Sequence, residues 1–75
     1  MSDDTTRKRE LRYMIEVASL AIPKEREAQN RYRATAKRAP GEMAKRLFEE
    51  MANQEEQHEA QLRAIIRYLE DELSR

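Results

Sequence analysis

Ala39-Pro40-Gly41-Glu42 is the only strong break in this chain of 75 residues. Proline does not continue a helix and glycine weakens one, whereas the segments on either side are rich in helix-forming residues. This pattern predicts an all-α fold: a helix at about residues 6–38, capped by Asp4 or Thr5, a turn at 39–41 and a second helix at about 41–73. Because the turn is short, we expect an antiparallel hairpin that forms one domain over residues 1–75.

Composition and size narrow the class of protein. Fifteen basic and fifteen acidic residues cancel, so we expect neither nucleic acid nor a membrane surface as a partner. No apolar run is long enough to span a bilayer or to form a secretory signal, which favours a cytoplasmic protein. A chain this short buries only about 60% of its unfolded surface. Since it has no cysteine for a disulfide, metal binding or oligomerisation should stabilise it.

The second predicted helix has an apolar seam that two polar residues interrupt. The seam follows steps of three and four residues, which keep one face of a helix turned inward. Counting onward from Met51 reaches Glu55 and His58 before Leu62. A carboxylate and an imidazole therefore occupy predicted core positions. The apolar members of the seam are Ala44, Phe48, Met51, Leu62, Ile65 and Leu69.

Glu25 interrupts the corresponding apolar band of the first predicted helix. Burying an ionised carboxylate there costs on the order of several kcal/mol unless it is paired, protonated or bound to a cation. Glu25 precedes Pro40 by fifteen residues, while Glu55 and His58 follow it by fifteen and eighteen. At 1.5 Å per residue, all three lie roughly 22 to 27 Å from the turn. The two helices should therefore bring them to one level.

Two carboxylates and one imidazole are too few for two metal ions, and one hairpin is only half of a four-helix bundle. A twofold dimer would supply Glu25 twice and the Glu55 and His58 pair twice, which is the ligand set of four-helix di-iron and di-manganese proteins. Two alternatives remain open. The three polar residues could instead fix the register of a metal-free helical dimer, or hold one structural zinc ion.

Two segments of the chain resemble the rubrerythrin branch of the ferritin-like superfamily. The first is residues 16–32, EVASLAIPKEREAQNRY, and the second is residues 47–62, LFEEMANQEEQHEAQL. The resemblance implies that Glu25 is a terminal ligand, that Glu55 bridges two iron ions and that His58 is a terminal nitrogen ligand. It also implies that Tyr32 lies beside the ligands without binding metal. An ordinary core aromatic is the alternative for Tyr32.

The chain departs from a full-length rubrerythrin, which has four helices and often a cysteine-ligated domain. A single hairpin is more similar to the encapsulated ferritins, whose di-iron site lies between two chains and which a shell protein encloses. The resemblance implies a homodimer or higher homo-oligomer with two irons per dimer, manganese and zinc being the alternative metals. We expect an oxidoreductase that oxidises ferrous iron with dioxygen or peroxide. Peroxide reduction is the alternative and would need an external reductase, because the chain has no cysteine.

Overall fold

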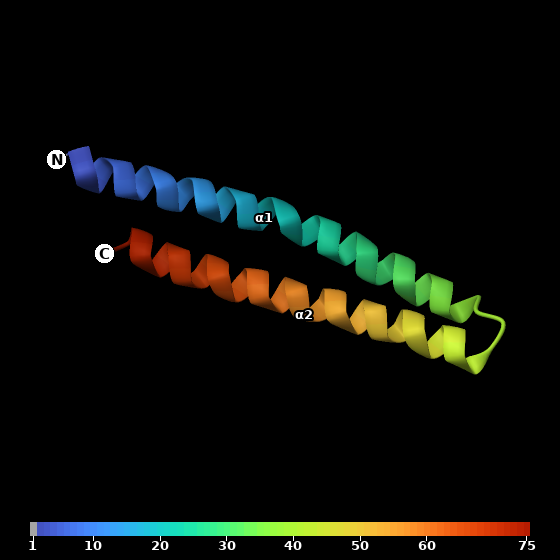
Figure 1. Ribbon diagram of the computed structural model, residues 1–75. Coiled ribbons are helices and arrows are strands. Elements are labelled where there is room, and N and C mark those ends of the chain that lie inside the picture. Colours follow the sequence, from blue (N-terminus) through green and yellow to red (C-terminus); the bar gives the residue numbers. More distant parts are fainter. Residues whose placement is uncertain (1) are drawn as a thin grey trace.

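The computed structural model describes residues 2–75 and consists of two helices, α1 (Ser2–Lys37) and α2 (Glu42–Leu73). The helices run antiparallel and pack side by side along their length, with both chain ends at one end of the hairpin and the connection at the other (Figure 1). The hairpin is 61 Å long and 14 Å across at its wider side. The predicted all-α hairpin is confirmed.

The helix boundaries differ from the prediction mainly at the start of the chain. α1 begins at Ser2 rather than at residue 6, so Asp4 and Thr5 lie within the helix and the predicted cap is wrong. Asp3 and Asp4 occupy the first turn, where negative charge interacts favourably with the helix dipole, and this explains the earlier start. α1 also continues through Pro23.

The connection comprises residues 38–41. Arg38 and Ala39 donate their backbone N–H groups to the carbonyls of Thr35 and Ala36, at 3.0 and 3.2 Å, and these bonds close the last turn of α1. The residue before a proline disfavours helical backbone, which ends α1 before Pro40. Gly41 is the N-cap of α2, with extended backbone and no side chain to accept a capping bond. α2 therefore starts at Glu42, one residue later than predicted.

The contact between the helices consists mainly of small and aliphatic side chains. Ala18, Ala36, Ala52 and Leu69 are buried, and half-buried side chains extend the same seam. The larger of these half-buried apolar residues include Leu11, Ile15 and Ile22 of α1 and Phe48, Leu62, Ile66 and Leu73 of α2. Small residues at the centre allow close approach of the helices, and the seam as a whole is narrow.

Met51 and Ile65 were predicted to belong to this seam, and that prediction is wrong. Their exposed fractions are 37% and 48%. The inward face of α2 instead continues through Ala52 and Ile66, one position further along. Steps of three and four residues did identify a real apolar stripe on α2. This stripe faces about a quarter of a revolution away from the side of α2 that contacts α1.

The two sides of the hairpin differ in polarity. One side, here called the open apolar face, carries a groove between the helices lined by Tyr13, Met14, Val17, Ala21, Leu62 and Ile65. Met51, His58 and Ile65 follow one another at seven-residue spacing, so they share this face on α2. The opposite side carries interhelical ion pairs, Arg26 with Glu59 at 3.2 Å and Arg33 with Glu56 at 2.6 Å. Among the residues whose side chains are described, 3–75, the first side carries the large exposed apolar surface.

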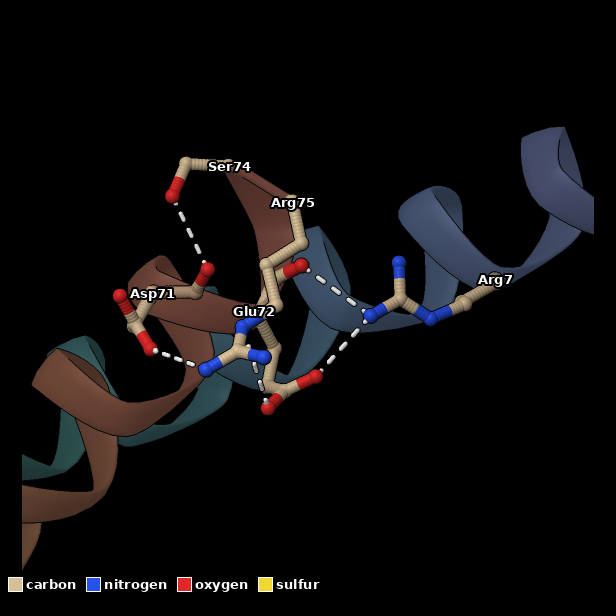
Figure 2. Close-up of polar contacts among 5 residues, drawn as sticks. All are labelled: Arg7, Asp71, Glu72, Ser74 and Arg75. Atoms are coloured by element: carbon tan, nitrogen blue, oxygen red, sulfur yellow. Dashed lines mark hydrogen bonds and ion pairs between the residues drawn. The ribbon is translucent and has the colours of Figure 1, made fainter.

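At the end remote from the connection, Arg7 of α1 joins the last turn of α2 (Figure 2). Its guanidinium donates to the Glu72 backbone carbonyl at 3.1 Å and to the Glu72 carboxylate at 3.0 Å. The last turn of α2 has no basic residue of its own. Arg7 therefore supplies the positive charge that favours a helix C-terminus.

Neither described helix is long and apolar enough to cross a membrane.

Candidate metal centre

Glu25 of α1 lies next to Glu55 and His58 of α2. Nδ1 of His58 is 3.6 Å from Oε2 of Glu25 and 3.6 Å from Oε2 of Glu55. One donor atom from each residue lies within 4.8 Å of the other two. The structure thus brings together the three residues that the sequence placed at one level, because both helices extend from the same turn.

The exposure of the three side chains is unequal. The Glu25 and Glu55 side chains are 24% and 22% exposed, whereas that of His58 is 53% exposed. In the single hairpin, His58 is therefore not the core residue that the seam predicted. It lies at the edge of the open apolar face, beside the two carboxylates. A partner that covered this face would bury all three groups together.

One carboxylate oxygen of this cluster has no hydrogen-bond donor. Oε2 of Glu25 is buried, and no group in residues 2–75 donates to it. The 3.6 Å contact with His58 is too long for a hydrogen bond. A buried acceptor without a donor is unfavourable, so this oxygen is well suited to receive a cation or a proton.

The Glu25 carboxyl group responds to these surroundings by binding its proton more tightly. Its pKa is raised above the ordinary value of 4.5, first because the protonated acid can share a hydrogen bond with Glu55. Partial burial and the negative charge of Glu55 raise the pKa further, while His58 opposes the shift. Two carboxylates this close resist joint ionisation, and a cation between them would remove that resistance.

The donor atoms fit a metal ion in type and spacing. Carboxylate oxygen with imidazole nitrogen suits iron, manganese and zinc, whereas the chain offers no thiolate. Ligand bonds of about 2.1 Å place two atoms on opposite sides of one ion about 4 Å apart. The observed limit of 4.8 Å is near this value, so small side-chain movements suffice. Glu55 and His58 also form the Glu-x-x-His motif that di-iron bundles place on a helix.

Tyr32 lies outside the three-residue cluster. It is half-buried two helical turns from Glu25, on the side of the connection, and this separation is about 10 Å along the helix axis. Its ring packs against Phe48 with 6.3 Å between the ring centroids and an angle of 45° between the planes. This contact fits the core aromatic that was the alternative. A role beside the ligands stays a prediction.

Two functional candidates, Gln29 and Glu59, were not found from the sequence. Gln29 is the buried polar residue of the described chain, with an exposed fraction of 8%. Its Nε2 donates to Oε1 of Glu59 at 2.9 Å. Each lies four residues after a member of the cluster, Glu25 and Glu55 respectively, and therefore on a neighbouring part of the same helix face. This spacing alone does not distinguish them from the many polar residues on the helix surfaces, because nothing in the sequence pairs them.

Glu59 is surrounded by donors from both helices. Arg26 Nε donates to its Oε2 at 3.2 Å and Arg63 Nε donates at 2.9 Å. The hydrogen bond from Gln29 is the main reason that the pKa of Glu59 lies below its ordinary value, and the bonds from Arg63 and Arg26 add to it. Glu59 is therefore a satisfied anion, in contrast to Glu25.

A helical hairpin that carries one carboxylate on its first helix and a Glu-x-x-His motif on its second has the architecture of half a ferritin-like bundle. The family model for rubrerythrin matches residues 16–75, which include the whole cluster, and the chain belongs to the rubrerythrin family. Members of this family typically bind iron. Neither the curated proteins nor the solved structures gave a significant match.

Proposed function

We propose that two copies of the hairpin pair through their open apolar faces and bind two iron ions between them, and that the dimer oxidises ferrous iron with dioxygen or peroxide. The observation that carries this proposal is the position of the cluster. Glu25, Glu55 and His58 converge at the edge of the open apolar face. Three donors are half of the ligand set that a di-iron bundle needs.

The dimer would complete this ligand set. Each chain contributes Glu25 as a terminal ligand, Glu55 as a bridging carboxylate and His58 as a nitrogen ligand, so two chains give four carboxylates and two imidazoles. Nδ1 is the His58 nitrogen that faces both carboxylates, and it would be the ligand atom. Four negative charges offset two divalent cations, which makes burial of the site in a shared core favourable.

The chain's own residues prepare the site for a cation. Because the pKa of Glu25 is raised, protons compete with a metal ion for this carboxyl group more strongly than at an ordinary glutamate. Once a second copy covers the groove, its apolar side chains would exclude water, and exclusion of water would strengthen the attraction between the carboxylates and a cation. Ferrous iron, when bound, supplies the electrons that reduce the oxidant.

Anaerobic titration with ferrous iron, followed by mixing with air-saturated buffer, tests this proposal. We expect two irons per dimer and consumption of dioxygen faster than in a protein-free control. Preferential reaction with peroxide, sustained only by an added reductase, would favour peroxide reduction instead. Saturable binding without oxidation would favour a structural metal, manganese and zinc included, and no binding would favour a helical dimerisation module.

A further inference from the structure

The contacts behind the cluster connect the two helices at one level. Gln29 Nε2 donates to Glu59 Oε1 at 2.9 Å and points to the backbone carbonyl of Glu55 at 3.5 Å, a weak contact. The Gln29 Oε1 atom accepts from Arg33 at 3.4 Å. Gln29 thus touches both the backbone of a cluster residue and the side chain one turn beyond it. All these groups lie on the side of the seam opposite to the open apolar face.

The apolar part of the seam is poorly suited to define the axial position of one helix against the other. Three of its four buried members are alanines, whose small side chains interlock little, and its larger side chains other than Leu69 are only half-buried. The short connection at residues 38–41 prevents a slide by a whole turn, about 5.4 Å, but it does not by itself prevent a slide by one residue, about 1.5 Å. Such a slide would shift Glu25 relative to the residues it meets on α2.

We propose that Gln29 and Glu59 are positioning residues that fix the axial register of α1 against α2 and thereby hold Glu25 beside Glu55 and His58. A buried hydrogen bond has one satisfied arrangement, whereas aliphatic contacts have several of similar energy. Because Gln29 is one turn from Glu25 and Glu59 is one turn from Glu55, any register error at this pair is transmitted directly to the cluster.

This inference deepens the proposed function, since register matters for activity only if the cluster binds metal. Its test uses the full chain and two readouts. The first is the affinity for Co²⁺, measured by calorimetry. The second is the nuclear Overhauser effect between the Tyr32 and Phe48 rings in the metal-free protein, which reports register without any metal.

We expect Gln29→Leu to keep the helical content and to lower the Co²⁺ affinity tenfold to a hundredfold, the range usual for residues that support metal ligands. The Tyr32–Phe48 signal should weaken or be replaced. Asn30→Leu is the matched control, because Asn30 is the exposed neighbour of Gln29 and should change neither readout.

Unchanged Co²⁺ affinity in folded Gln29→Leu would overturn the inference, and so would lost affinity with an intact Tyr32–Phe48 signal. If Gln29→Leu does not fold, Glu59→Leu and Glu59→Gln make the same comparison from α2. Glu59→Gln keeps an acceptor for Gln29 and should lose less affinity than Glu59→Leu, and equal losses would contradict a register role. If the wild-type chain binds no metal, the proposed function fails, while the ring contact still tests the register.

Discussion

Nδ1 of His58 on α2 lies 3.6 Å from Oε2 of Glu25 on α1. The two residues belong to different helices, and their proximity depends on similar lengths of chain to the connection, fifteen residues from Glu25 to Pro40 and eighteen from Pro40 to His58. The imidazole is half-exposed while the carboxylate oxygen is buried and lacks a donor. This pair therefore marks the boundary between the hairpin interior and the open apolar face, where a second copy would add the remaining ligands.

We expect substitutions within the cluster and outside it to differ sharply in their effect on iron oxidation. His58→Ala and Glu55→Ala each remove a proposed ligand and should abolish rapid ferrous oxidation. Glu27→Ala removes an exposed carboxylate on the same helix as Glu25 and should leave the rate nearly intact. Stopped-flow absorbance with equal protein and iron concentrations measures the three rates. Equal losses would show that the ligand assignment is wrong.

Glu25→Leu should have opposite effects on stability without and with iron. In the apo dimer it removes two of the four crowded carboxyl groups, so the melting temperature should rise. With iron it removes a ligand, so most of the stabilisation by metal should be lost. That stabilisation is about 2.7 kcal/mol at a free metal concentration one hundred times Kd, for one site.

The increase in stability that Glu25→Leu gives the apo protein should depend on pH. Because the folded-state pKa of Glu25 is raised above 4.5, the folded protein binds more protons than the unfolded chain in this window. The stability of the wild type therefore falls as pH rises from 4.5 through that raised pKa. The variant lacks this loss, so its stability should exceed that of the wild type by the largest amount above the raised pKa. Thermal melts with chelator across this range give the comparison, with Glu27→Leu as the control. A variant destabilised both with iron and with chelator would favour an inert polar core.

Glu59 should make the hairpin less stable as the pH falls, which is the opposite of the effect expected for Glu25. Its pKa lies below 4.5 because of bonds from Gln29, Arg63 and Arg26. The stability that it contributes is fully present above pH 4.5 and is lost as pH falls through its folded-state pKa. Glu59→Gln should therefore be less stable than the wild type at pH 7, and the two should converge in acid. Denaturant unfolding at one fixed protein concentration would show this, and a constant difference at all pH values would contradict it.

Arg7→Ala should lower stability by less than about 1 kcal/mol, since the Arg7 side chain is 41% exposed and solvent screens its ion pair. The loss should shrink in high salt. Arg9→Ala removes an exposed arginine from the same turn and serves as the matched control. If the two variants melted at the same temperature, the contact of Arg7 with the end of α2 would contribute nothing.

Much of this fold could be predicted because its determinants are local. Pro40 and Gly41 end one helix and precede the next, and equal counts from the turn brought Glu25 and Glu55 to one level without any knowledge of packing. The rotation of α2 about its own axis was harder to predict. Met51 and Ile65 form as regular a stripe as Ala52 and Ile66, and only the contact with α1 distinguishes the inward stripe from the exposed one.

Gln29 and Glu59 could not be assigned from the sequence for a related reason. In a chain with thirty charged residues, one more glutamine and one more glutamate have the expected composition of a solvated helix surface. Their pairing appears only when the helices are placed side by side. The position of a second chain depends in the same way on surfaces that a single hairpin leaves uncovered.

The central claim is that the metal site is shared between two chains. Native mass spectrometry of protein loaded anaerobically with ferrous iron tests it most directly, because it reports the number of chains and the number of ions in one particle. We expect dimers, or multiples of dimers, with two irons per dimer, and no iron in any monomer. A folded monomer that retains iron, or a dimer that binds none, would contradict it.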